Sequence, residues 1–187
     1  ELSAVWENAH VGQAYRSDPA GVFGNAFRWL SSLLWGGWIK QRSAISLLDN
    51  APLAEMLERH LSFQGIQRSI QTGALSALGI TAWGYTSGQS VTFYQGADNI
   101  VPWKRERRIG VATCIGVEHL MASSAIPLLF PAVRINREYF GDGSMRQLAP
   151  IRPALHLGAE RVLVIGVRPS VESPPDRVKV DSYPTLA

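Results

Sequence analysis

The residue of this chain best placed for chemistry is Asp142, which stands between two glycines in the segment Tyr139-Phe-Gly-Asp-Gly-Ser144. A β-prone run at 138–140 ends just before it, so the carboxylate is expected at a strand end with little steric cover, where a substrate could approach. Gly141 and Gly143 permit positive φ and close backbone contact, which bulkier neighbours would forbid. Asp-Gly is also a common turn dipeptide, and the pair alone favours an ordinary turn.

Other signatures of catalysis are absent from the sequence. There is no G-x-S-x-G, since the nearest match, Gly84-Tyr-Thr-Ser-Gly88, puts its serine one place too late. H-E-x-x-H, a P-loop, G-x-G-x-x-G and paired cysteines are also missing, so metal and dinucleotide chemistry gain no support and no cofactor or metal site is expected. The histidines fall on expected helices, where a structural role is favoured: His10, His60, His119 and His156.

Composition bounds the class of protein. A chain of 187 residues with 46% hydrophobic and 18% charged residues is globular, and its length predicts a single domain. A net charge of +3 without a basic stripe argues against a nucleic-acid partner. No secretory signal or membrane span is recognisable, so a cytoplasmic location with possible membrane association is expected. The first residues read as the middle of an amphipathic helix, and the last residues read as the beginning of a new element, which suggests truncation at both ends.

The elements that must position Asp142 follow from hydrophobic periodicity and turn residues. A helix from about residue 115, stopped by Pro127, leads into two short strands. An antiparallel hairpin is expected earlier in the chain, and a buried parallel strand after Asp142. Together they predict an α/β fold with a central, mostly parallel sheet flanked by helices. The expected strands are 75–85, 89–95, 132–135, 138–140 and 161–167, and the further helices are 2–10, 51–60, 66–74 and 150–157.

Two further segments each have two possible interpretations, and the single cysteine has one. The aromatic-rich segment 22–38 is either a buried helix or a lid that touches lipid. The basic run Lys104–Arg108 reads as a solvated loop, with a phosphate headgroup contact as the alternative. Cys114, the sole cysteine, is expected to be an inert core residue.

Between residues 44 and 168 the sequence resembles the patatin-like phospholipase family. The resemblance is carried by His119-x-x-Ala-Ser123-x-Ala-Ile-Pro127-x-x-Phe and by Tyr-x-Gly141-Asp142-Gly143-Ser144, where the family's usual Asp-Gly-Gly appears as Asp-Gly-Ser. It implies a patatin-like α/β domain with a variable helical or cap segment at 1–43 and a Pro-rich tail at 169–187. The helix and turn of 119–127 would position the strand that ends at Asp142.

The resemblance also implies an activity, that of a lipid acyl hydrolase. In this family a serine and an aspartate form a catalytic dyad, in which the aspartate takes the serine's proton and later activates water. Only the aspartate can be carried over, onto Asp142, because this chain has neither the family's glycine-rich oxyanion loop nor its nucleophile elbow. The serine is therefore expected outside this sequence, the substrate to be phospholipid or another acyl lipid, and the chain as given to be inactive. A non-catalytic lipid-binding or regulatory module of the same fold is the alternative.

Overall fold

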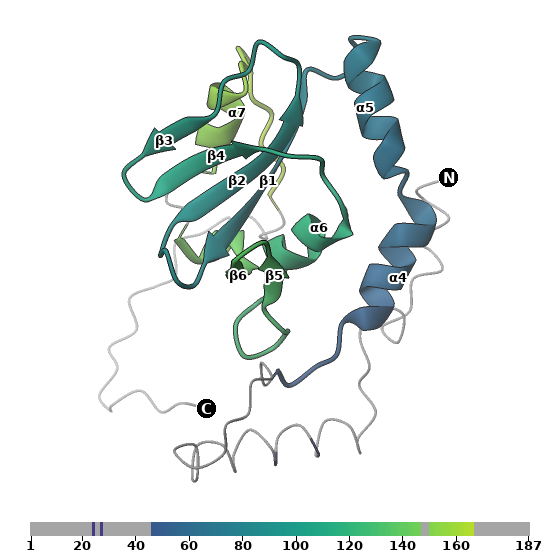
Figure 1. The fold of residues 1–187 in the computed structure, drawn as a ribbon, viewed down its shortest axis with the longest axis vertical. Helices are drawn as coiled ribbons and strands as arrows, with labels where there is room; N and C mark the ends of the chain where they lie inside the picture. Colours follow the sequence, from purple (N-terminus) through teal and green to yellow (C-terminus); the bar gives the residue numbers. More distant parts are fainter. Residues whose placement is uncertain (1–23, 25–26, 28–45, 147–149, 167–187) are drawn as a thin grey trace, which may run out of the picture.

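The computed structural model describes residues 24, 27, 46–146 and 150–166. Six strands form one sheet in the order β3-β4-β2-β1-β6-β5 (Figure 1). In chain order the strands are β1 (Ala77–Gly84), β2 (Ser90–Gly96), β3 (Trp103–Arg105), β4 (Arg108–Ala112), β5 (Val133–Ile135) and β6 (Glu138–Asp142). Among these described strands only the β2–β4 pair is parallel, and the other pairs are antiparallel.

The sheet with its helices confirms the predicted α/β class but not the predicted direction of the strands. The helices are α4 (Ala51–His60), α5 (Phe63–Gln71), α6 (Val117–Ser123) and α7 (Arg152–His156), with a 3-10 turn η1 (Gly143–Arg146) directly after β6. Figure 1 shows α4 and α5 following one another along one side, with α6 between α4 and the sheet. The mostly parallel sheet was a wrong prediction, because β1 lies between two antiparallel neighbours, β2 and β6.

Turn and capping residues explain where the β1–β2 hairpin and the helices α4 and α5 begin. The hairpin and α4 form where the sequence predicted them, whereas α5 begins and ends three residues before the predicted helix 66–74. Gly88 adopts φ +63° in the turn between β1 and β2, a conformation that glycine accepts without strain. The start of α4 is stabilised by Asp49, whose Oδ1 accepts the N–H of Ala51 at 2.9 Å, and Pro52 follows in the first turn. At the start of α5, the Ser62 side chain accepts the N–H of Gly65.

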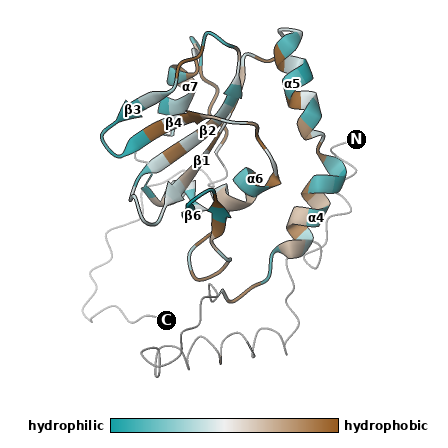
Figure 2. Cartoon of the chain, viewed as in Figure 1, coloured by the Kyte–Doolittle hydropathy of each residue, from teal (hydrophilic) through white to brown (hydrophobic). Residues whose placement is uncertain are grey.

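The hydrophobic core lies between the sheet and α6. Phe93 on β2 is at its centre, in edge-to-face contact with Phe140 on β6 at 5.2 Å and with His119 on α6 at 4.9 Å between ring centroids. Along α5, hydrophobic and hydrophilic residues alternate (Figure 2), and its Phe63 and Ile66 pack against this core. The buried members are Ile80, Ala82, Val91, Phe93, Ile115, Ala122, Ile135 and Phe140.

The predicted buried strand at 161–167 is not formed. Residues 161–166 have no regular secondary structure, residue 167 lies outside the described ranges, and the side chains of Leu163 and Ile165 are 87% and 86% exposed. A strand is stabilised by hydrogen bonds to a neighbour, and none of the six described strands pairs with this segment. Its apolar composition alone therefore does not bury it.

Two smaller expectations need correction. Residues 104–107 are exposed to solvent, as expected, but the run Lys104–Arg108 forms a β-hairpin rather than a loop, with Arg107 at φ +57° in the turn between β3 and β4. Cys114 is exposed rather than part of the core, because it falls in the irregular segment between β4 and α6.

Several expectations concern residues outside the described ranges. The helix at 2–10, the tail at 169–187 and most of the segment 22–38 belong to this group. Within 22–38 only Gly24 and Phe27 are described; both are helical, and the Phe27 side chain is 72% exposed. None of the helices in the described ranges is long and apolar enough to cross a membrane.

Glu138 fixes the β1–β2 turn from the neighbouring strand β6. Its Oε1 accepts the N–H groups of Thr86 and Ser87 at 2.9 and 2.6 Å. Replacing Glu138 with alanine is expected to lower the free energy of unfolding by about 2 kcal/mol, because two hydrogen bonds to a charged acceptor are lost. Chemical denaturation of the variant measures this change.

The matched control is Glu55→Ala, which removes an exposed carboxylate that pairs with Arg59 one helical turn away at 3.1 Å. Such a pair is worth only about 0.3–0.5 kcal/mol. If the two variants lost equal amounts of unfolding free energy, Glu138 would contribute no more to stability than an exposed surface charge.

Candidate active site

Asp142 is the last residue of β6, as the sequence predicted. Its backbone N–H donates to the carbonyl oxygen of Ala125 at 2.9 Å, and its Cα lies opposite that of Ala82 in the register with β1. The half-buried side chain turns back on its own loop, where Oδ1 accepts the N–H of Ser144 at 2.8 Å. The strand and the turn thus fix the position of the carboxylate, and Oδ2 receives no hydrogen bond from the described residues.

The glycines that flank Asp142 are both closely packed against their neighbours. A Cβ at Gly141 would lie 2.9 Å from the hydroxyl oxygen of Tyr85, and a Cβ at Gly143 would overlap the carbonyl oxygen of Thr81 on β1. Neither glycine has a positive φ, so of the two expected reasons for glycine only close backbone contact is confirmed.

Tyr85 lies beside Gly141 and contacts the indole ring of Trp83 at 4.8 Å between centroids. Partial burial raises the pKa of the Tyr85 phenol above its usual value, because the ionised form would lose solvation. The hydroxyl therefore stays protonated at neutral pH and can donate a hydrogen bond.

The motif residues on α6 have structural roles. His119 is buried, and its Nδ1 accepts the N–H of Gly116 at 3.0 Å. That bond needs the lone pair of Nδ1, so the carboxylate of Glu118, 3.2 Å from the same nitrogen, is a close neighbour rather than a hydrogen-bond partner. Ser123 Oγ donates to the carbonyl oxygen of Thr81 at 2.8 Å. The two side chains fix α6 at its start and attach its end to β1.

The chain after α6 supplies the contact with Asp142. The prediction that Pro127 stops this helix was wrong, because α6 already ends at Ser123 with Ser124 as its C-cap. The fully buried Ala125 then offers its carbonyl oxygen to the Asp142 N–H. Pro127 lies in the following turn, in which Leu128 has φ +69° and accepts the N–H of Leu47 at 3.0 Å. The expectation that the helix and turn of 119–127 position the strand at Asp142 agrees with these contacts.

Asp142 and its turn form part of the wall of a cavity of about 820 Å³. Gly143, Ser144 and Ser123 share that wall with the carboxylate, whereas the rest is mainly apolar and comes from β1, α6 and α7. The lining apolar residues include Leu78, Ile80, Leu120, Pro153 and Leu157. The cavity therefore places a carboxylate beside a mainly apolar surface.

The contribution of α7 to this cavity was missed in the sequence. The sequence feature that could have predicted it is a series of small residues at alternate positions of β1, which leaves room for a helix to pack on that face of the strand. These residues are Ala77, Gly79 and Thr81. Leu157, directly after α7, packs over Gly79, where a Cβ would come within 2.9 Å of the leucine Cδ1.

Asp142 has no hydroxyl partner in the described part of the chain. No serine hydroxyl among residues 46–146 and 150–166 donates a hydrogen bond to the Asp142 carboxylate, and Ser144 contacts it through its backbone. In the same part of the chain, no group of three or more His, Cys, Asp or Glu side chains could hold a metal ion.

Comparison with known protein families gives a match over most of the chain. The family described as patatin-like phospholipase matches residues 2–155, a span that includes α6, β6 and Asp142. No curated protein and no solved structure matches the chain significantly.

Proposed function

The chain belongs to the patatin-like phospholipase family, and we propose that it supplies the general base of a lipid acyl hydrolase with a serine–aspartate dyad. The observation that supports this most is the placement of Asp142. Its carboxylate is held at a strand end by the N–H of Ser144, in the wall of a largely apolar cavity. The nucleophilic serine is expected outside this sequence, since the 187 residues contain no G-x-S-x-G.

In the proposed reaction the serine Oγ attacks the carbonyl carbon of a lipid ester while Asp142 accepts the hydroxyl proton. The C–O bond to the alcohol then breaks, and the proton passes from Asp142 to the leaving oxygen. Water attacks the resulting acyl-serine, with Asp142 again taking a proton, and the fatty acid is released as the serine recovers its hydrogen. Aspartate is normally a weak base for a hydroxyl, so backbone amides must stabilise the oxyanion.

A non-catalytic lipid-binding module of the same fold is the second candidate. It is favoured by the absence of any serine hydroxyl on Asp142 within the described part of the chain. The cavity would then hold an acyl chain, and Asp142 would serve to close its own turn.

The 187-residue chain alone is expected to hydrolyse a short-chain ester no faster than the uncatalysed blank. The reason is chemical, since a base without a nucleophile and an oxyanion site cannot form the acyl-enzyme. Release of a chromogenic alcohol measures the rate. Sustained turnover that disappears on Asp142→Asn would contradict the expectation and place the nucleophile within residues 1–187.

A further inference from the structure

A second cavity, of about 400 Å³, lies at the other end of η1 from Asp142. Three segments that are distant in sequence meet around it: the β1–β2 turn, the β3–β4 turn and the last two residues of η1. Its lining consists of Gly88, Glu106, Arg107, Arg108, Met145 and Arg146. Arginine is the commonest residue in this lining.

The backbone that carries two of these arginines is fixed by the sheet. Arg108 is the first residue of β4, opposite Ser90 on β2, and the carbonyl oxygen of Arg107 accepts the N–H of Ser90 at 2.9 Å. The turn between β3 and β4 is only two residues long and consists of Glu106 and Arg107. The two guanidinium groups therefore start from a defined backbone position.

Arg146 reaches the cavity from η1. Its guanidinium carbon lies 5.8 Å from the centroid of the Trp83 ring, a cation–π geometry that leaves the N–H donors of the fork available at its edge. The indole nitrogen of Trp83 is itself buried and has no hydrogen-bond partner in the described part of the chain. The neighbouring Met145 exposes 52% of its surface.

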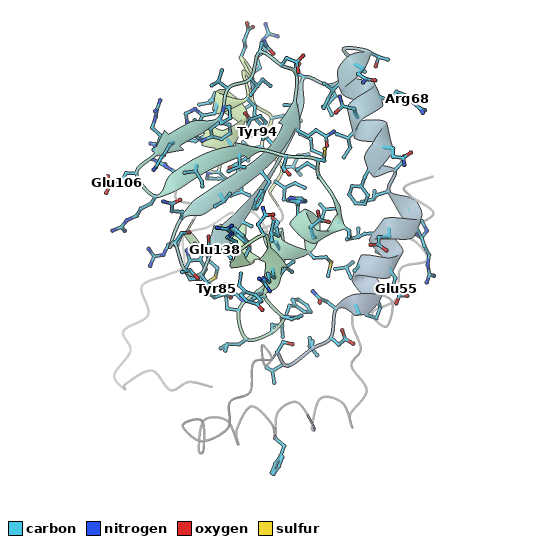
Figure 3. All side chains as sticks on the ribbon, viewed as in Figure 1. Glu55, Arg68, Tyr85, Tyr94, Glu106 and Glu138 are labelled. Atoms are coloured by element: carbon cyan, nitrogen blue, oxygen red, sulfur yellow. The ribbon has the colours of Figure 1, made fainter. Side chains whose placement is uncertain are left out.

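The charge of the cavity is unbalanced. Its lining contains three arginines and one carboxylate, and Lys104 and Arg105 precede it on β3. Within the described residues, none of the three lining arginines forms an ion pair with a carboxylate. Glu106 lies at the outer tip of the β3–β4 turn (Figure 3).

We propose that this cavity binds a phosphate group, either as a lipid headgroup or as a free anion. Arginine suits this ligand because its planar fork donates two parallel hydrogen bonds to phosphate oxygens. The three guanidinium groups come from two separate elements, so they can approach one anion from different directions. Since Arg107 and Arg146 are exposed, binding should weaken as ionic strength rises.

The test compares the 187-residue chain with the variant Arg107→Gln/Arg108→Gln, at low ionic strength. The control is Arg59→Gln/Arg68→Gln, which removes the same charge from α4 and α5; Figure 3 places Arg68 on the opposite side of the molecule from Glu106. One arm titrates inorganic phosphate against chloride of equal ionic strength and follows the thermal midpoint. The other arm measures co-sedimentation with vesicles of phosphatidylcholine alone or mixed with phosphatidic acid.

In the first arm, phosphate is expected to raise the midpoint of the wild-type chain and of the control, and the cavity variant should need roughly tenfold more phosphate for the same rise. In the second arm, co-sedimentation that requires phosphatidic acid and is lost only in the cavity variant identifies the ligand as a lipid headgroup. A phosphate response without vesicle binding identifies a free anion. Equal responses of the cavity variant and the control in both arms, or no response of the wild-type chain, would overturn the proposal. Neither arm involves hydrolysis, so the outcome is independent of the role of Asp142.

Discussion

Asp142→Asn is expected to reduce ester hydrolysis by about 10²–10⁴-fold in a protein that carries these residues together with the nucleophilic serine, because the amide cannot accept the serine proton. The substitution keeps the shape of the side chain. An asparagine Oδ1 can still accept the N–H of Ser144, which now binds the aspartate at 2.8 Å. Stability should therefore change by no more than about 1 kcal/mol. Initial rates on a chromogenic ester, together with the thermal midpoint, separate loss of the base from loss of the fold.

Asp98→Asn is the matched control for this experiment. Asp98 is exposed in the segment between β2 and β3, so the same chemical change there alters net charge without touching the cavity. Its rate should equal that of the wild type. If Asp142→Asn hydrolysed the ester at the wild-type rate, Asp142 would have no part in the mechanism and the lipid-binding alternative would gain support.

Local signals in the sequence predicted the elements around Asp142 well because those elements are determined locally. Gly88 in the first hairpin, Pro52 at the start of α4 and Gly158, with φ +92°, after α7 all act within a few residues of their position. The parallel or antiparallel pairing of the strands is not determined locally. β1 pairs with β6 across more than fifty residues of sequence, and no periodicity within either strand specifies that neighbour.

The segment 161–166 was also predicted wrongly because strand formation depends on a partner strand that local sequence does not specify. Its run of β-branched and aliphatic residues is typical of a buried parallel strand, and yet it has no strand partner among the described residues. The hairpin at Lys104–Arg108 was missed for the opposite reason. Its charged residues are typical of a loop, but backbone pairing of Arg108 with Ser90 and Arg105 makes a strand of it.

At the site, the sequence placed Asp142 at the end of a strand and gave two reasons for its glycines, of which one is confirmed. Gly141 and Gly143 have no positive φ, whereas the expected close contact is present, beside Tyr85 and the Thr81 carbonyl group. The contact with Thr81 could not be predicted because it depends on the β1–β6 pairing. It also makes Gly143 the residue in this loop that should tolerate a side chain least.

Gly143→Ala is expected to lower the free energy of unfolding by about 3 kcal/mol. The added methyl group would overlap the carbonyl oxygen of Thr81, which is a backbone atom of the central strand β1. A flexible side chain could rotate away, but β1 is hydrogen-bonded on both sides and cannot move without disturbing β2 and β6. The thermal midpoint should fall by about 6–12 °C in a protein of this size.

Gly166→Ala is the control for this variant. Like Gly143 it lies outside the α-helices, and a Cβ at Gly166 would have no heavy atom within 4 Å. Its midpoint should stay within about 2 °C of the wild type or rise slightly, since alanine restricts the unfolded chain. If Gly143→Ala behaved like this control, the turn after Asp142 would have room to move away from β1. The carboxylate would then not be held by the close packing that the structure shows, and the case for a preorganised base at this position would fall with it.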